Sequence, residues 1–229
     1  MDLYAVLPII FQQQITDSSF LVQLLQVSRS CKALLAHAVC ADQIIYTSMD
    51  DYNTIAAAYP EACRNSKRIQ FSHNIIVNPG PLLTNIVSSR LLQTLCIPED
   101  RSIQNRHIQH CVALRRLILP KNKCISNAGL VNMSALRYLD LSANTRVTDA
   151  GLQNKHRLEY LRMLFNKHIT DAAFIYMRNL RCVDLGYNKN KKLCLSFVAQ
   201  NQYLLEVRLQ NANILHKVAR KFAGVVNPS

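Results

Sequence analysis

The residues best suited to chemistry lie close together in the middle of the chain, as His107-x-x-His110-Cys111 followed by Cys124. Imidazole and thiolate groups are zinc ligands, and a thiol beside an imidazole can also serve as a nucleophile. The spacing matches no standard zinc finger, however, and both cysteines flank positions of a repeated pattern. The five glycines form no phosphate-binding loop, and the chain lacks the Gly-x-Ser-x-Gly turn of many hydrolases. The sequence therefore predicts a protein that is not an enzyme, with no metal site and no cofactor.

The elements that position these residues follow a pattern that recurs every 22 residues. Leu-x-x-Leu-x-Leu-x-x-Asn spans 114–122 and 136–144, and variants with one Met or Val span 158–166 and 180–188. This pattern is the signature of the leucine-rich repeat, in which each copy forms one strand and one returning segment. Shorter copies lie at 92–97 and 204–209, and strand-like cores lie at Ile69-x-Phe71 and Ile44-x-Tyr46. The predicted fold class is α/β, a leucine-rich-repeat solenoid with short parallel strands on the concave face and short helices or turns on the convex face.

The chain divides into three predicted parts. Residues 41–210 form the solenoid, with the best repeats in 92–209. Residues 1–40 do not follow the repeat and form a helical segment at the N-terminal end. Residues 211–229 carry apolar side chains at helical spacing, which suits a C-terminal helical cap and tail because the ends of a solenoid need covering.

Two polar features of the repeat are predicted to be structural. The asparagine that ends each copy is expected to turn inward and hydrogen-bond the backbone of adjacent coils. These residues are Asn122, Asn144, Asn166 and Asn188. The returning segments 125–130, 147–152 and 169–174 begin with Ser or Thr followed by Asn or Asp, which predicts helix starts capped by those side chains.

Side chains between the inward leucines point to the opposite face of each strand and form the predicted partner-binding surface. The residues assigned to it are Arg116, Ile118, Tyr138, Asp140, Tyr160, Arg162, Asp184 and Arg208, with Cys182 and Glu206 completing the row of Tyr138 and Tyr160. Neighbouring strands lie about 4.8 Å apart, so Asp140, Arg162, Asp184 and Arg208 are expected to form a ladder of alternating charge. Two interpretations stay open: exposed charges that pair with one another for little energy, or a recognition stripe anchored by tyrosine and arginine.

The net charge of +13 is concentrated in the second half of the chain. Residues 1–100 hold 6 Lys and Arg against 8 Asp and Glu, whereas residues 101–229 hold 21 against 6. The resulting balance of +15 suits an acidic partner or nucleic acid, although the sequence contains no aromatic and basic signature of a known RNA-binding module. Nucleic acid is therefore an open alternative, and protein partners are favoured.

The sequence also predicts where the protein works. The start of the chain lacks the positive flank and the long apolar core of a secretory signal, and no stretch approaches the roughly 20 apolar residues of a membrane helix. The eight cysteines include no Cys-x-x-Cys pair, so free reduced thiols are expected. These features predict a cytoplasmic or nuclear protein that does not bind a membrane and that acts as a monomer within a complex.

The N-terminal residues resemble a known family. Leu7-Pro8, followed by Leu-Leu-Gln-Val-Ser-Arg-Ser-Cys-Lys-Ala-Leu over 24–34, looks like an F-box, which opens with Leu-Pro and closes with a Val-x-x-x-Cys-Lys helix. Together with repeats of the Ile-Thr-Asp-x-Gly-Leu kind, these residues make about 7–215 similar to the F-box/leucine-rich-repeat proteins. The segment after Leu7-Pro8 departs from the family in lacking its usual acidic residue, and the loop between the helices is short. The resemblance implies that a Skp-type adaptor is bound by Leu7, Pro8, Leu24, Val27 and Cys31.

This resemblance implies the substrate-recognition subunit of a Skp–cullin–F-box-type ubiquitin ligase, with the target held on the concave face. Two alternatives stay open. Residues 1–40 would be only an N-terminal cap if the chain is a leucine-rich-repeat scaffold outside any ligase. The chain would instead be a ribonucleoprotein component if its basic C-terminal half binds an acidic partner.

Overall fold

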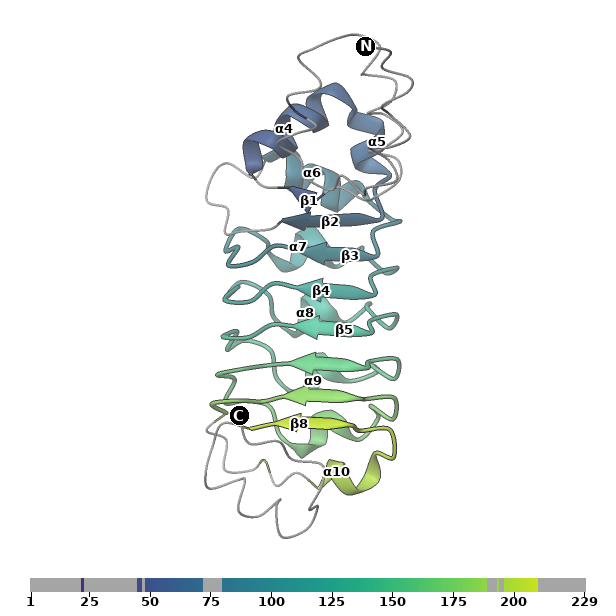
Figure 1. Ribbon diagram of the computed structural model, residues 1–229, viewed down its shortest axis with the longest axis vertical. Coiled ribbons are helices and arrows are strands. Elements are labelled where there is room, and N and C mark those ends of the chain that lie inside the picture. The colour runs from purple at the N-terminus through teal and green to yellow at the C-terminus, as the bar shows by residue number, and fades with distance from the viewer. Residues whose placement is uncertain are drawn as a thin grey trace, which may run out of the picture.

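Eight short parallel strands are stacked in chain order along the length of the molecule (Figure 1). The computed structural model describes residues 22, 45–46, 48–71, 80–188, 193 and 196–209. The strands are β1 Ile45–Tyr46, β2 Arg68–Phe71, β3 Thr94–Cys96, β4 Arg116–Ile118, β5 Tyr138–Asp140, β6 Tyr160–Arg162, β7 Cys182–Asp184 and β8 Glu206–Arg208. Each strand pairs only with its neighbours in sequence, which is the topology of a solenoid. The predicted fold class is confirmed, and every copy of the leucine pattern supplies one strand.

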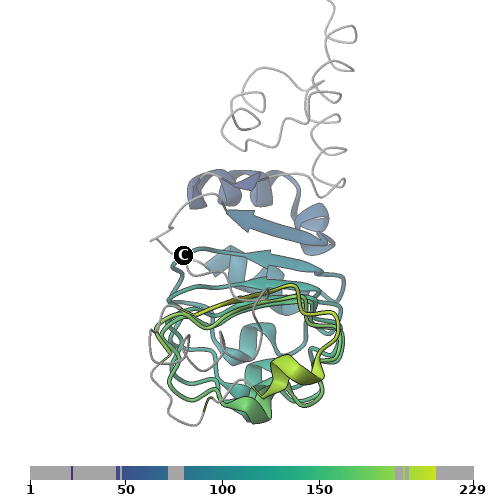
Figure 2. The same ribbon diagram turned by 60° about the horizontal axis from the view of Figure 1, so that its bottom comes forward.

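Helices follow the strands, and those between β2 and β7 form a second layer, behind the sheet in Figure 1 and on one side of it in Figure 2. The first two helices lie at the N-terminal end of the stack of strands. The helices are α4 Met49–Ala58, α5 Pro60–Arg64, α6 Gly80–Ser88, α7 Asn105–Ile108, α8 Asn127–Leu130, α9 Asp149–Leu152, the 3₁₀ helix η1 Asp171–Phe174 and α10 Phe197–Gln200. The N-terminal coils contain the longer helices, and the repeats from β4 onward return through a single helical turn. We call the two sides of the solenoid the sheet face and the helix face.

The core lies between these layers and is built from the inward side chains of every coil. Leu117, Leu139 and Leu161 are partners in the strand register and are fully buried. Burial of such a side chain stabilises the fold by about 1.5–3 kcal/mol. Because a coil exposes this face until the next coil covers it, the stability of each coil depends on its neighbours.

Three of the four predicted asparagines, Asn122, Asn144 and Asn166, are shown to join successive coils by hydrogen bonds to backbone carbonyl groups. The buried Asn144 donates from Nδ2 to the carbonyl oxygens of Asn122 and Ile125, at 2.8 Å each. Its Oδ1 accepts from the backbone N–H groups of Arg146 and Val147, at 2.9 Å each. One fully buried side chain therefore satisfies four backbone groups.

A further member of this row is an aspartate that the leucine pattern did not reveal. Asp100 stands 22 residues before Asn122, and its Oδ2 accepts from the backbone N–H groups of Ser102 and Ile103 at 3.0 and 2.8 Å. The Asp100 carboxylate thus accepts the same two backbone hydrogen bonds as the asparagine side chain does in later repeats, but a carboxylate has no N–H group to donate. The copy at 92–97 therefore extends to a complete repeat ending at Asp100.

A second row of polar bridges joins the returning segments, and here the predicted capping is largely wrong. The helices start where expected, but Ser126 and Thr148 make no capping bond to their own helices. Instead, Asn127 of one coil donates to Thr148 Oγ1 and accepts from Thr148 N, at 2.9 Å each. Of the three predicted caps, only Thr170 accepts a hydrogen bond from its own helix, from Ala172 N at 3.2 Å. The polar pair at each helix start serves mainly to hold coils together.

These bridges explain why Gly151 is a glycine. A Cβ at this position would lie 2.6 Å from Asn127 Oδ1 and 3.2 Å from Asn127 Cα. Asn127 cannot retreat without breaking its two bonds to Thr148. Overpacking of this kind costs about 1–3 kcal/mol. We therefore expect Gly151→Ala to lower the free energy of unfolding in urea by about 2 kcal/mol, even though alanine favours a helix.

The control for this prediction is Ala150→Ser, at an exposed neighbouring position of the same helix. Its effect should stay within about 0.5 kcal/mol. A stabilising effect of Gly151→Ala would show that helix propensity outweighs the close approach of the coils, and would contradict this explanation.

Several predictions concern residues outside the described ranges. The F-box-like residues Leu7, Pro8, Leu24, Val27 and Cys31 all lie there, as does the predicted C-terminal helix within 211–229. Within the described ranges, no helix combines the length and the apolar character that a bilayer crossing requires.

Candidate binding site on the sheet face

The structure brings all the predicted partner-binding residues together on one face of five adjacent strands, β4 to β8. In the strand register, Arg116 is paired with Tyr138, and Tyr138 with Tyr160. In the neighbouring row the partners follow in the order Ile118, Asp140, Arg162, Asp184 and Arg208. The repeat therefore converts residues that are 22 or 24 positions apart into two adjacent rows.

The first row is a stack of planar side chains. The Arg116 guanidinium lies 4.3 Å from the centre of the Tyr138 ring, and the Tyr138 and Tyr160 rings stack with centroids 5.8 Å apart. Tyr160 is 42% exposed, and burial raises the pKa of Tyr138. Because each side chain is held by its neighbour, a partner would meet surfaces that lose little rotational freedom on binding. Tyrosine and arginine are also the residue types that most often anchor interfaces.

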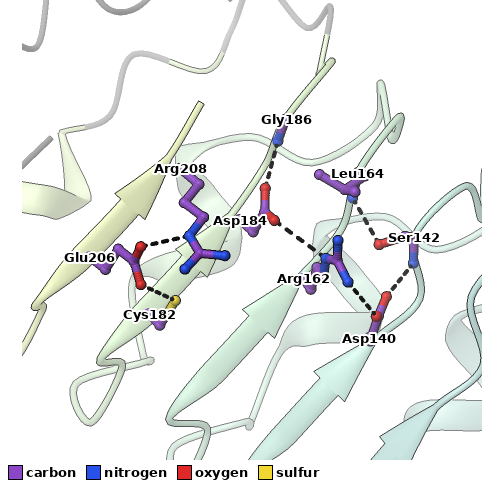
Figure 3. A network of polar contacts seen from close by, with 9 residues as sticks. All are labelled: Asp140, Ser142, Arg162, Leu164, Cys182, Asp184, Gly186, Glu206 and Arg208. Atoms are coloured by element: carbon purple, nitrogen blue, oxygen red, sulfur yellow. Dashed lines mark hydrogen bonds and ion pairs between the residues drawn. The ribbon is translucent and has the colours of Figure 1, made fainter. Parts of the chain in front are cut away.

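The second row centres on Arg162, which lies between two carboxylates (Figure 3). Its Nη1 is 3.6 Å from Asp140 Oδ2, and its Nε is 3.3 Å from Asp184 Oδ2. The carboxylates are themselves fixed, because each accepts a hydrogen bond from a backbone N–H group two residues later in the chain. An exposed ion pair contributes only about 0–1 kcal/mol to stability. The arrangement therefore orients an exposed guanidinium more than it stabilises the fold.

The predicted ladder of alternating charge differs from the structure in two respects. Asp140 does not face solvent: its side chain is only 6% exposed. Arg208 bonds to Glu206 on its own strand, with Nε 2.6 Å from Oε1. Glu206 lies two residues away on the same face of the strand, so it meets Arg208 without spanning to the next coil. The ladder thus ends at Asp184, and the Arg208 hydrogen bond lowers the pKa of Glu206.

A hollow of about 170 Å³ lies between the two rows. Its lining residues are Tyr138, Tyr160, Leu161, Arg162, Cys182, Asp184 and Arg208. Small-molecule sites usually measure about 300–1,000 Å³, so this hollow suits a single side chain of a partner better than a metabolite. Burial raises the pKa of Cys182 to about 11, which keeps the thiol neutral at pH 7 and unsuited to act as a nucleophile.

The histidines and cysteines that suggested chemistry have separate structural environments. His107 Nδ1 accepts from Gln104 N at 3.0 Å at the start of α7, and burial lowers the pKa of His107. Cys111 is fully buried in the core, where burial raises its pKa to about 11. The Cys124 Sγ atom lies 3.3 Å from the Arg101 carbonyl oxygen, within hydrogen-bond distance for a thiol. In the described part of the chain, no three His, Cys, Asp or Glu side chains are grouped to hold a metal ion.

Comparisons with known proteins agree with this architecture. Residues 132–154 match a family model described as Leucine Rich repeat. The search of the curated proteins finds no match. Among solved structures, internalin C2 from Listeria monocytogenes is 21% identical with a TM-score of 0.50, and the match covers 65% of this chain and 74% of that one. By its repeat and its fold, the chain is a leucine-rich-repeat solenoid.

Two further solved structures share the fold over more of this chain. A chain of the Rad7 and Elc1 complex in yeast is 16% identical with a TM-score of 0.54, with coverage of 80% of this chain and 61% of that one. The Listeria monocytogenes internalin inlF is 12% identical with a TM-score of 0.50, with coverage of 82% and 55%. The present chain spans less than two thirds of the length of both proteins. Identities this low show a common fold alone.

Proposed function

We propose that this chain is a protein-interaction adaptor that binds its target on the sheet face. The observation that carries the proposal is the row of Arg116, Tyr138 and Tyr160, held in place beside the oriented guanidinium of Arg162. Exposed aromatic and arginine side chains that are already ordered are the usual anchors of protein interfaces. The hollow next to them has the size of a partner's side chain, which fits recognition of a folded or extended protein segment.

We further propose that the adaptor is the substrate-recognition subunit of a Skp–cullin–F-box-type ubiquitin ligase. The support is the resemblance of Leu7-Pro8 and 24–34 to an F-box, joined to repeats of the Ile-Thr-Asp-x-Gly-Leu kind. A solenoid of the same fold occurs in the yeast complex of Rad7 with Elc1, which supports a role as one subunit of an assembly. In this role the chain positions a target and carries out no bond-making step itself.

The sheet-face proposal predicts a specific loss of partners. We expect the double variant Tyr138→Ala, Tyr160→Ala to lose the proteins that the wild-type chain captures from cell extract, as measured by quantitative mass spectrometry. For any captured protein then purified, the dissociation constant should rise roughly 30-fold or more, the usual effect of removing an interface anchor. The matched control is Tyr176→Ala, which removes a tyrosine that is 52% exposed next to η1 on the helix face. Equal capture by the wild type and the double variant would exclude the sheet face as the binding site.

The ligase proposal predicts binding of a purified Skp-type adaptor to the full chain. Leu24→Asp and Val27→Asp should each abolish that binding, because both place a charge in the apolar surface that the resemblance assigns to the adaptor. Gln26→Asp adds the same charge at a polar position and should bind like the wild type. A folded wild-type chain that binds no such adaptor would leave the sheet-face proposal intact and remove the ligase assignment.

A further inference from the structure

The turns that follow the strands form a surface of their own, which we call the turn edge. In the coils of β3 to β7 the chain bends there at a residue with positive φ, and the series is Glu99, Lys121, Ala143, Phe165 and Tyr187, with φ between 57° and 63°. Successive turns are hydrogen-bonded in register: Lys121 N donates to Ser142 O and Ala143 N to Leu164 O, at 2.7 and 2.8 Å. The side chains of the series therefore follow one another along the edge, one per coil.

These positions favour glycine, yet the chain places none there. A left-handed backbone costs a residue with a Cβ about 1–2 kcal/mol, and glycine avoids that cost. Phe165 and Tyr187 are both bulky and both about half exposed, so burial in the core does not explain them. Strain that is retained at an exposed position is a reason to look for a function of the side chain.

The rings of Phe165 and Tyr187 form a parallel stack, and the stack has different neighbours on its two sides. The ring centroids are 4.5 Å apart and the ring planes differ by 1°. On the other side of Phe165 the equivalent position is Ala143, which offers only a methyl group. Beyond it, Lys121 is engaged with Glu99 in an ion pair. Because neighbouring coils are about 4.8 Å apart, the Ala143 position leaves the thickness of one flat ring beside Phe165.

The turn edge is also strongly basic. The turns 119–124, 141–146 and 163–168 contain no Asp or Glu. They present the exposed cations Lys121, Lys123, Arg146 and Lys167. The sheet face differs, because there Arg162 and Arg208 are balanced by three carboxylates within ion-pair distance. Lys121 is paired with Glu99, whereas Lys123, Arg146 and Lys167 form no ion pair with the residues that the structure describes. Basic side chains without an ionic partner, beside an exposed aromatic stack, are the combination that binds single-stranded nucleic acid.

We propose that the turn edge binds single-stranded nucleic acid, with one base stacked on Phe165 above Ala143 and the flanking phosphates on Lys123, Arg146 and Lys167. A single strand is required, because the bases of a duplex are stacked on one another and their faces are not available. An acidic peptide would use the cations but would leave the ring face of Phe165 without a planar partner. The site is separate from the sheet face and does not depend on the function proposed for it.

The test measures fluorescence anisotropy of a labelled oligouridylate of about 12 nucleotides, and of the matching single-stranded DNA, with the full chain. A chain this basic binds any polyanion to some degree, so the deciding variant leaves the charge unchanged. Phe165→Ala should weaken binding roughly 5- to 150-fold, the effect of losing one stacked base. Alanine already occupies the equivalent turn at Ala143, so this variant is expected to fold, and Phe165→Tyr should restore binding.

A second variant distinguishes the contribution of the basic side chains to binding from that of base stacking. Arg146→Gln should reduce the slope of log affinity against log salt by about 0.7, the value for one phosphate contact on a single strand, whereas Phe165→Ala should leave the slope unchanged. Tyr138→Ala on the sheet face should have no effect on either quantity. Undiminished affinity of Phe165→Ala would overturn the proposal. Binding of oligoglutamate as tightly as the oligonucleotide would also overturn it, in favour of an acidic protein partner.

Discussion

Asn144→Ala is expected to lower the free energy of unfolding by about 4 kcal/mol, a large fraction of the 5–15 kcal/mol that stabilises a typical domain. The substitution leaves two carbonyl oxygens and two backbone N–H groups without their partner. Each buried polar group left unpaired costs about 1–3 kcal/mol, and water entering the vacated space offsets part of the sum. Urea unfolding followed by circular dichroism measures the effect from the midpoint and slope.

Asn132→Ala is the matched control for this expectation. Asn132 is exposed, and its Nδ2 donates to the Gln109 carbonyl oxygen at 3.2 Å. The control should change stability by no more than about 0.5 kcal/mol. If Asn144→Ala proved as mild as the control, the row of asparagines would not be what joins the coils.

Lys155→Met is expected to act in the opposite direction and to stabilise the chain by about 1–3 kcal/mol. Lys155 is only 1% exposed, and its Nζ donates to the Gln153 carbonyl oxygen at 3.3 Å. The coils on either side place Met133 and Met177 at the equivalent position, and both are buried. Methionine therefore fits the space without an ammonium group to desolvate. The melting temperature should rise by roughly 2–4 °C per kcal/mol gained in a chain of this size.

The pH dependence of stability gives an independent check of this prediction. Burial lowers the pKa of Lys155 below its usual 10.5, so the unfolded chain binds more protons between the two pKa values. The stability of the wild type should therefore rise with pH in the window that ends near 10.5, relative to the variant. The advantage of Lys155→Met should be greatest at neutral pH and should shrink through that window. Lys167→Met, at an exposed site, should show no such trend; an equal trend in both variants would exclude Lys155 as its source.

The leucine pattern was sufficient to predict the strands, their order and the side chains of the sheet face. These follow from one period, because a residue's place in the repeat fixes both its layer and its neighbours in the next coil. The inward asparagines were predictable for the same reason, since a polar residue at a buried turn must satisfy backbone groups.

Other features depend on geometry that the period does not contain. Arg208 forms its ion pair with Glu206 on its own strand and not with Asp184 on the neighbouring strand. The sequence does not show which of these two carboxylates lies within bonding distance. Ser126 and Thr148 bond to the preceding coil instead of their own helices because that coil approaches closely. The positions that form the turn edge share a backbone conformation and no side-chain chemistry, so nothing in Glu99, Lys121, Ala143, Phe165 and Tyr187 marks them as a set.

Lys155 was discoverable from the sequence by aligning the returning segments as well as the strands. That alignment places it with Cys111, Met133 and Met177, so a charged residue stands in an apolar column. The neighbours alone, Asn154 and His156, give no sign of burial.

The strict pairing of each strand with its sequence neighbours has a consequence for how a partner would act on the chain. Within the described sheet, β4 and β8 do not pair with each other and are connected only through the three strands between them. In a linear array of this kind, melting starts at a free end and advances one unit at a time. A protein bound along the sheet face from Arg116 to Arg208 would contact all five coils, β4 to β8, at the same time. Its binding would suppress fraying along the whole span, so occupancy would be visible as slower amide hydrogen exchange in strands that the partner touches only at their outer surface.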